Sequence, residues 1–456
     1  MKPSLPKGTR DFTPDQVSKR NYLKGILQAT FKQFGFSPIE TPSFEKRETL
    51  MGKYGEEGDR LIFKILSNGE KLKKADLTAL NEERLAAFSN SLSEKALRYD
   101  LTVPFARYVA QHQNDLVFPF KRYQIQPVWR ADRPQHGRFQ EFYQCDADVV
   151  GSHSLWQEVE LCQLYASVFS QLGLEGTVLN VNHRKILAGI AEIIGAEDKL
   201  VDFTVALDKL DKIGFDGVVD ELKTKGFTAT AIKKIAPLVA IDGTIAEQLN
   251  QLDDLFSSSP IGQEGIKELR FVFTQLEKLE MHSLSLAFDL TLARGLNYYT
   301  GCIFEVSPPK KVSIGSIGGG GRYDDLTAGF GMKNMSGVGI SFGFERIYLV
   351  MEELNLFPTS AVNSTQVLFV NFGDETALHC HELIQSLRKK GISAEFYPDA
   401  AKLKKQFSYA DKKRIPWVVM LGSDELNSNT VVLKEMKGGT QSSVPTPELI
   451  GRLSVQ

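Results

Sequence analysis

The sequence has no uninterrupted apolar stretch of the ~20 residues that a membrane-spanning helix needs. Its first six residues also lack the apolar run of a secretion signal. We therefore expect a cytoplasmic protein that enters no membrane. Cysteine is scarce as well, because the chain holds only four, at 145, 162, 302 and 380. They form no CxxC pair and are too scattered for a disulfide framework, which argues against a structural zinc site.

Positive charge is not in excess, since 54 Lys and Arg face 56 Asp and Glu, for a formal net charge of −2. This balance excludes a protein coated with basic residues for indiscriminate nucleic-acid binding. A local basic face would still be enough to meet RNA phosphates. The seven histidines are scattered along the chain, and no convincing His/Ser/Cys catalytic set is visible.

The 456 residues leave room for roughly three domains. Thr13, Pro14 and Gln16 predict a helix with a capping box that ends at Gly35. Ser154 and Gln157 predict the start of a second helix in the same way. Residues 184–280 are rich in helical periodicity without a chemical motif, which indicates an inserted domain.

A Pro/Ser/Thr/Asn-rich linker at 358–364 marks a boundary near the C-terminal end of the sequence. Beyond it, strand-like segments at 367–370, 394–397 and 417–421 alternate with helix-like segments at 375–390 and 403–413. This alternation predicts a small α/β domain with a largely parallel sheet.

Residues 126–151 read as strand, polar loop and strand. Because side chains alternate across a strand, we expect Arg138, Phe142, Gln144 and Asp148 to share one face. Polar residues on an antiparallel sheet often simply face water. Here, however, an arginine, an aromatic ring, an amide and an acid follow in series, which suits a phosphate, a flat base and an amino acid.

Three further segments also carry side chains that could bind a ligand. Asp100 and Thr102 lie two apart and so on one strand face, although an Asp and a Thr that cap a turn are the alternative. In the segment 294–299, an arginine stands beside a glycine and two tyrosines. The alternative to a binding role for this segment is a turn with a purely structural role. Arg346 begins a predicted helix, where its charge opposes the helix dipole and indicates an anionic ligand or a paired carboxylate.

Together these segments resemble the class II aminoacyl-tRNA synthetases and, within them, the histidine-specific family. Residues 34–42, 130–148 and 337–346 are similar to motifs 1, 2 and 3 of the class. Residues 294–299 and 319–324 resemble the signatures of the histidine enzymes. Residues 402–412 with Lys434 are similar to the class IIa anticodon-binding domain. The resemblance spans residues 5 to about 440.

The resemblance implies an α+β catalytic domain at 1–355, with an antiparallel sheet flanked by helices. It also implies a helical inserted domain at 184–280 and a C-terminal α/β anticodon-binding domain at 364–456. The implied reaction is ATP-dependent activation of L-histidine to histidyl-adenylate with release of pyrophosphate, followed by transfer to the 3′-terminal adenosine of tRNA(His). ATP would be a substrate, Mg²⁺ a cofactor, and the protein a homodimer, since motif 1 is the dimer-interface motif.

The resemblance also implies roles for single residues. The histidine-binding set is Asp100, Thr102, Arg130, Gln144, Asp148, Arg294, Tyr298 and Tyr299. The ATP-binding set is Arg130, Asp132, Arg138, Phe142 and Arg346. The tRNA-binding set is Lys402, Lys404, Lys405, Lys412 and Lys413. Arg130 and Arg294 would be the catalytic residues, and no metal ligand from the protein is assigned.

These roles agree with the chemistry, because attack of a carboxylate on a phosphorus brings two anions together. Arginines and Mg²⁺ can screen that repulsion, and a carboxylate that is already ionised needs no general base. Two positions depart from the family pattern: Asp132 stands where glutamate is frequent, and Asn297 where aspartate is frequent. Because asparagine is uncharged, no role that rests on a charge is expected at position 297.

Two alternatives remain open. A non-catalytic, histidine-sensing regulatory subunit would share the fold but tends to lose the signature arginines and the C-terminal domain, which this chain keeps. Another class IIa synthetase, for proline, threonine or glycine, is not expected to carry both histidine signatures.

Overall fold

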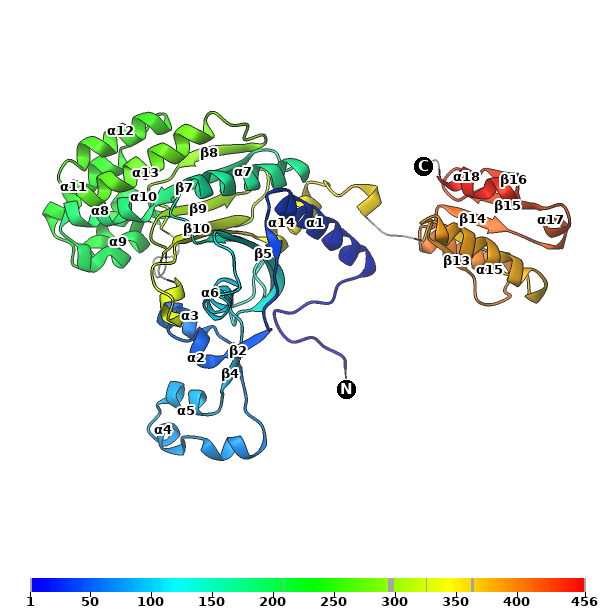
Figure 1. The fold of residues 1–456 in the computed structure, drawn as a ribbon, viewed down its shortest axis with the longest axis horizontal. Coiled ribbons are helices and arrows are strands. Elements are labelled where there is room, and N and C mark those ends of the chain that lie inside the picture. The colour runs from blue at the N-terminus through cyan, green and yellow to red at the C-terminus, as the bar shows by residue number, and fades with distance from the viewer. Residues whose placement is uncertain (1, 208, 294–298, 325, 362–364, 455–456) are drawn as a thin grey trace. The chain divides into compact units, whose positions relative to one another are not determined.

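The computed structural model describes residues 2–454 except 208, 294–298, 325 and 362–364. The chain forms two compact units, residues 1–357 and 358–456 (Figure 1). Within the described residues, no helix is both long and apolar enough to cross a bilayer.

An eight-stranded sheet in the order β1-β5-β6-β11-β10-β9-β7-β8 is the centre of the first unit. Its strands are β1 (Ser37–Pro38), β5 (Phe120–Trp129), β6 (Glu141–Val150), β7 (Thr177–His183), β8 (Leu284–Phe288), β9 (Cys302–Ser307), β10 (Gly318–Tyr323) and β11 (Gly337–Phe342). All neighbouring pairs are antiparallel except β1 with β5 and β7 with β8. The expected α+β unit with a mainly antiparallel sheet is confirmed.

One face of this sheet packs against α1 (Pro14–Gln33), α7 (Trp156–Gln171) and α14 (Phe344–Glu353). The contact is aromatic: the ring of Phe31 lies 5.1 Å from Tyr123 and 5.7 Å from Phe342. The predicted capping box of α1 is confirmed, because Thr13 and Gln16 each bind the other's backbone N–H.

The start of α7 differs from the prediction. The helix begins at Trp156 with Leu155 at its N-cap and without a side-chain cap, so Ser154 and Gln157 form no capping box. A buried ion pair accounts for the difference. Arg322 in β10 donates to both carboxylate oxygens of Glu158 at 2.5 Å and to the carbonyl of Ser154 at 3.2 Å, so it sets where the chain enters the helix.

The opposite face of the sheet is covered in part by α6 (Thr102–Gln111), which Figure 1 shows within the curve of β5 and β6. Phe105 and Val109 of α6 pack there with Val150 and Tyr323. Polar side chains of β5 and β6 also lie on this face, which makes it the side of the sheet that can hold a ligand.

In the segment that the sequence marks as an insertion, the described residues form six helices after β7. They are α8 (Arg184–Ile194), α9 (Leu200–Leu207), α10 (Leu210–Thr224), α11 (Ala229–Val239), α12 (Ile245–Leu255) and α13 (Pro260–Leu276), with a short 3-10 turn η2 (Glu197–Lys199). The helical content is as predicted. Their buried side chains, such as Ile186 and Leu269, belong to the same core as the sheet, so a separate inserted domain stays a prediction.

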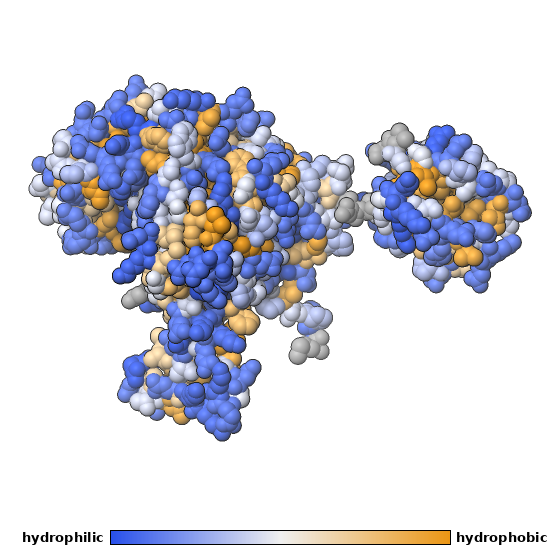
Figure 2. Space-filling model, in the orientation of Figure 1, coloured by the Kyte–Doolittle hydropathy of each residue, from blue (hydrophilic) through white to orange (hydrophobic). Residues whose placement is uncertain are grey.

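A smaller sheet, β2-β4-β3, lies near α6 and carries a protruding lobe (Figure 1). Its elements are β2 (Phe44–Lys46), α2 (Arg47–Leu50), α3 (Gly55–Arg60), β3 (Lys64–Ile65), η1 (Gly69–Lys74), α4 (Leu77–Asn81), α5 (Leu85–Ser91) and β4 (Lys95–Leu97). Figure 2 shows the lobe as mostly hydrophilic, with apolar spots; Leu77 and Leu85 are 62% and 65% exposed. The chain runs from β4 directly toward Asp100 and Thr102. The 3-10 turns η3 (Leu326–Phe330) and η4 (Thr359–Ala361) lie farther along the chain.

The second unit has its own five-stranded sheet, in the order β13-β12-β14-β15-β16. Its elements are β12 (Val367–Phe369), α15 (Asp374–Lys389), β13 (Ala394–Phe396), α16 (Leu403–Lys412), β14 (Trp417–Met420), α17 (Ser423–Asn427), β15 (Thr430–Glu435), β16 (Gln441–Pro445), η5 (Thr446–Glu448) and α18 (Leu449–Ser454). The predicted parallel part is confirmed for β12 to β14. The last two strands were not predicted, and they pair antiparallel. Phe369, Ile384 and Val419 belong to a core within this unit.

The buried pair of Arg322 and Glu158 predicts a large stability effect. Glu158→Gln keeps the shape but leaves the Arg322 guanidinium buried and uncompensated, so the free energy of unfolding should fall by about 3–5 kcal/mol. Glu160→Gln is the matched control, because Glu160 in the same helix is 33% exposed and pairs with Lys121; it should cost under about 1 kcal/mol. Urea unfolding of both variants measures this, and equal losses would contradict the assignment.

Candidate active site

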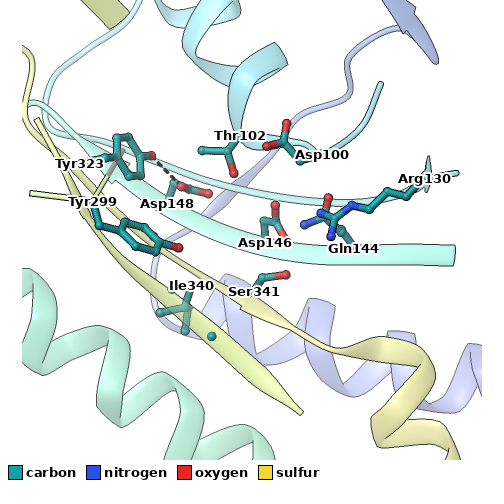
Figure 3. Close-up of a pocket in the computed structure, with 13 residues that line it drawn as sticks. Asp100, Thr102, Arg130, Gln144, Asp146, Asp148, Tyr299, Tyr323, Ile340 and Ser341 are labelled. Carbon is teal, nitrogen blue, oxygen red and sulfur yellow. Dashed lines mark hydrogen bonds between the residues drawn. The ribbon is translucent and has the colours of Figure 1, made fainter. Parts of the chain in front are cut away.

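A polar pocket opens on the α6 side of the large sheet (Figure 3). The space free of protein atoms within it is about 410 Å³, a volume that includes open solvent. The lining residues are Asp100, Thr102, Arg130, Gln144, Asp146, Asp148, Tyr299, Gly319, Gly320, Tyr323, Gly339, Ile340 and Ser341. Among the described residues, three carboxylates and the guanidinium of Arg130 therefore line the same pocket.

Strand register explains why these groups meet. Asp148 of β6 lies opposite Arg122 of β5 and Gly339 of β11. Two residues back along β6, Asp146 lies opposite Ser341. Because side chains alternate along a strand, Asp146 and Asp148 point to the same face. The other face carries the aromatic core, so the polar row is directed into the pocket.

The carboxylate of Asp148 is the most enclosed group of the pocket. Arg122 lies 2.8 Å from its Oδ2, with side-chain exposures of 0% and 3% for the pair. Tyr323 donates its hydroxyl to Oδ1 at 2.6 Å, as the dashed line in Figure 3 shows. Burial raises the pKa of Asp148, while Arg122 and Tyr323 lower it in part. A methyl group at position 339 would lie 2.0 Å from Oδ1, so only glycine leaves room for this arrangement.

Asp146 lies between Gln144 and Asp148 in Figure 3 and is 2% exposed. Burial raises the pKa of Asp146 to about 7, with partial compensation by Arg122. Its Oδ1 and the Oε1 of Gln144 are buried and have no hydrogen-bond partner among the described residues. Unpaired buried acceptors are costly, and here they face a cavity that a hydrogen-bond donor could fill.

Asp100 and Thr102 enter the pocket from above β6 (Figure 3). The expectation of a shared strand face is wrong: Asp100 lies in a loop, and Thr102 is the first residue of α6. The Asp100 carboxylate accepts from Tyr54 Oη at 2.8 Å and from the N–H of Val103 at 3.1 Å. The helix start and the pocket wall therefore use the same carboxylate, whose pKa is raised by burial.

Arg130 lies at the other end of the pocket, where β5 passes into the loop before β6. Its Nε donates to the carbonyl of Tyr99 at 3.0 Å, and its guanidinium lies 4.3 Å from the Tyr99 ring centroid and 5.2 Å from that of Phe142. In the same loop Asp132 lies 3.5 Å from Arg138, which is 48% exposed. This end of the site is cationic and aromatic.

Arg346 connects the loop to α14. Its Nε donates to the carbonyl of Gly137 at 3.2 Å and its Nη1 to the carbonyl of Ser316 at 2.8 Å. The cation at the helix start thus borders the loop that carries Asp132 and Arg138. The geometry provides an acidic half that suits an amine and a cationic half that suits phosphate.

Comparison with known proteins agrees with this chemistry. A family model described as histidyl-tRNA synthetase matches residues 78–347, and an anticodon binding domain model matches residues 366–456. The chain is 60% identical over 453 residues to a histidine–tRNA ligase of Christiangramia forsetii, with 99% of each chain covered. The chain belongs to the histidyl-tRNA synthetase family.

Solved structures show the same fold. A histidyl-tRNA synthetase from Nostoc sp. PCC 7120 aligns with a TM-score of 0.83 and 31% identity, covering 99% of this chain and 98% of that one. A protein from Bacillus halodurans C, titled ATP phosphoribosyltransferase regulatory subunit/histidyl-tRNA synthetase, aligns with a TM-score of 0.72 at 20% identity, covering 90% and 97%. At that identity the likeness concerns the fold alone.

The structure brings together most of the residues that the synthetase resemblance singles out. From the histidine-binding set, Asp100, Thr102, Arg130, Gln144, Asp148 and Tyr299 line one pocket. Arg294 and Tyr298 lie outside the described residues. From the ATP-binding set, Arg130, Asp132 and Arg138 lie in the loop between β5 and β6, Phe142 lies near Arg130, and Arg346 reaches the same loop.

Among the residues of the pocket and its wall that sequence reasoning missed are Arg122, Asp146 and Tyr323. Asp146 could have been found, because it has the same strand parity as Gln144 and Asp148. Tyr323 lies within the signature at 319–324, but nothing in the sequence says that it bonds to Asp148. Arg122 could not be assigned, since its pairing depends on the register of two strands.

The raised pKa of Asp146 predicts that the free energy of unfolding depends on pH. Its folded pKa of about 7 lies above the unfolded value of about 3.9, so the folded state binds the proton more tightly. The stability that this group contributes is present below about pH 4 and is lost as the pH rises through about 7. Asp146→Asn removes the dependence, so the variant should gain free energy of unfolding relative to the parent between about pH 5 and about pH 8.

Urea unfolding at several pH values measures the difference. Asp254→Asn, on the exposed side of α12, is the control and should give a difference that does not change with pH. A pH-independent difference for Asp146→Asn would contradict the assignment.

Proposed function

We propose that this protein is a histidine–tRNA ligase of the cytoplasm. It activates L-histidine with ATP to histidyl-adenylate, releases pyrophosphate, and transfers the histidyl group to the 3′-terminal adenosine of tRNA(His). The observation that carries the proposal is one pocket that brings together three buried carboxylates, those of Asp100, Asp146 and Asp148, and the guanidinium of Arg130. Identity of 60% to a histidine–tRNA ligase over nearly the whole chain supports it. The domain boundaries 1–355, 184–280 and 364–456 belong to the same proposal.

Histidine suits the acidic half because it brings several N–H donors and a positive charge. We assign its ammonium and ring N–H groups to acceptors on Asp100, Gln144, Asp146 and Asp148. A site built around buried acceptors rejects analogues that lack the donor, because the acceptors would then remain unpaired. Thr102, Tyr298 and Tyr299 complete the proposed histidine site.

The cationic half suits ATP. We assign Arg130 to the histidine carboxylate and the α-phosphate, with Arg294 opposite, because guanidinium groups can stabilise the charge that develops on the phosphoryl oxygens. Arg138 and Arg346 would bind the outer phosphates, Asp132 would contact ATP, and Phe142 would stack on adenine. No proton needs to be removed from the attacking carboxylate, since it is ionised at neutral pH.

Mg²⁺ is part of the proposal as a companion of ATP. Within the described residues, no group of three or more His, Cys, Asp or Glu side chains could hold a metal ion. Such an ion is commonly held by substrate phosphates, waters and one or two carboxylates, and its charge would offset that of the phosphates.

Histidine-dependent exchange of pyrophosphate into ATP, without tRNA, tests the proposal. Arg130→Ala should reduce the exchange rate by about 100-fold or more, as the loss of one transition-state donor does elsewhere. Arg84→Ala is the control, because Arg84 is 53% exposed in the protruding lobe and pairs with Glu82. Histidine binding without any exchange would instead identify a regulatory subunit. Exchange with proline, threonine or glycine would identify another synthetase.

The exposed lysines of α16 are proposed to meet tRNA. Gln406 and Ala410 are buried on this helix, while Lys404, Lys405 and Lys412 are exposed. Lys402 is the N-cap residue. Lys413, also in the predicted tRNA-binding set, lies 2.9 Å from Glu395 and 3.0 Å from Tyr409 Oη. Its charge is therefore already balanced within the unit.

Replacing Lys404, Lys405 and Lys412 together by Ala should raise the Michaelis constant for tRNA. It should also flatten the salt dependence by roughly one unit of slope per lost phosphate contact. Lys413→Ala is the internal control and should change the slope less than any of the three. Pyrophosphate exchange should be the same in all variants. Damaged exchange with an unchanged salt slope would refute the RNA-binding role of α16.

We further propose a homodimer built around the motif 1-like segment. β1 is the edge strand of the large sheet, and Ser37 and Pro38 are exposed there. An isologous pairing across this region would cover the edge. Sedimentation equilibrium should give twice the chain mass of 50.9 kDa. A species of 50.9 kDa at micromolar concentration would refute the dimer.

A further inference from the structure

The segment before α1 carries contacts that neither the fold nor the proposed function explains. In Figure 1 it is the blue coil that leads from the N-terminus into α1; we call residues 6–12 the strap. The carbonyl of Gly8 accepts the backbone N–H of Gln140 at 2.9 Å. A side chain at position 8 would lie 2.6 Å from Gln140 Cγ, and the φ of Gly8 is +82°. Glycine therefore allows this close contact with the end of the β5–β6 loop.

Arg10 makes the second contact of the strap with this loop. Its guanidinium carbon lies 3.3 Å from the ring centroid of Phe139. The same guanidinium donates to Glu345 Oε2 at 2.6 Å. Phe139 belongs to the β5–β6 loop, and Glu345 is the neighbour of Arg346 in α14. One side chain thus joins the two segments that carry the proposed ATP-binding residues.

The contacts continue from the strap to those residues. Gln140 accepts the N–H of Arg130 at 2.9 Å with its carbonyl, and its side-chain amide donates to the carbonyl of Asp132 at 3.0 Å. Arg346 donates to the carbonyl of Gly137 in the same loop. The strap therefore closes a ring of contacts around the loop and the first turn of α14.

Glu345 shows that Arg10 is not needed merely to neutralise a buried charge. Glu345 is 5% exposed and already accepts two hydrogen bonds from Arg20, at 2.7 and 2.8 Å. Burial alone would raise the pKa of Glu345, but Arg20 and Arg10 outweigh it and hold the pKa below its usual range. Arg20 lies in α1 and attaches that helix to α14. What Arg10 adds is the connection to Phe139 and the loop.

We propose that Arg10 is a positioning residue for the ATP half of the site, holding the β5–β6 loop against α14. The inference rests on the proposed function, because the ATP roles of Arg130, Asp132, Arg138 and Arg346 belong to it. Among the described residues, Arg10 contacts Phe12, Phe139 and Glu345, none of which lines the pocket, and it acts through Phe139 and Glu345. Loss of Arg10 should therefore weaken the alignment of the loop and leave the acidic half intact.

Pyrophosphate exchange with separate titration of ATP and histidine tests this inference. Arg10→Ala should raise the Michaelis constant for ATP about tenfold, because a small misplacement of positioning groups is costly. The constant for histidine should stay within about twofold. Lys7→Ala is the matched control, since it removes an exposed cation from the same strap, and it should leave both constants unchanged. Arg10→Lys keeps a charge near Glu345 but loses the planar contact, so it should restore only part of the ATP effect.

The variant Phe139→Leu provides a second, independent test of the inference. It keeps the ion pair of Arg10 with Glu345 and removes the ring, and it should raise the same constant for ATP. The double variant Arg10→Ala/Phe139→Leu should be no worse than about the larger single effect, because both act through one contact. Equal loss for ATP and histidine, or additive effects of the two variants, would overturn the inference. An absence of histidine-dependent exchange in the parent protein would instead overturn the proposed function.

Discussion

The buried ion pair of Arg122 and Asp148 is the constraint on which the first unit depends. Taking two charges out of water costs several kcal/mol for each ion, so such a pair persists only with good geometry and further contacts. The strand register provides the geometry, because the two residues lie opposite each other on β5 and β6. The ring of Phe105 lies 4.3 Å from the guanidinium, Tyr323 donates to the carboxylate, and Gly339 leaves it room. Four strands (β5, β6, β10 and β11) and α6 are thereby arranged around one pair.

This arrangement divides the pocket into halves of opposite character. Arg122 balances the charge of Asp148 through a buried ion pair. Asp146 Oδ1 and Gln144 Oε1, in contrast, are buried acceptors without a hydrogen-bond partner among the described residues. The desolvation of those acceptors lowers stability, and a ligand with matching donors would recover it on binding. At the other end, Arg130 is held by the carbonyl and ring of Tyr99, which fixes the cation without neutralising it. A cationic amine and an anionic phosphate would thus enter the same site in one orientation.

The supports of the site come from segments far apart in the sequence. The strap before α1, the β5–β6 loop and α14 meet at Arg10, Phe139 and Glu345. Tyr54 follows β2, at the base of the protruding lobe, and donates to Asp100 beside α6. The second unit has its own core and presents exposed lysines on α16, among them Lys404, Lys405 and Lys412. Amino-acid chemistry and the proposed RNA contact are therefore built on separate cores.

Local patterns in the sequence determined the elements whose causes are local. The capping box of α1, the β5–β6 hairpin and the shared face of Gln144 and Asp148 all follow from residues a few positions apart. Motif resemblance pointed to six of the residues that line the pocket: Asp100, Thr102, Arg130, Gln144, Asp148 and Tyr299. The tertiary structure decided what depends on distant partners. Asp100 lies in a loop rather than a strand because Tyr54 and the start of α6 hold it. Helix α7 begins where Arg322 holds the chain, and Arg122 acts only through its register with Asp148. Periodicity reports which face a side chain occupies, but the free energy of burying a charge depends on which partner the fold brings to it.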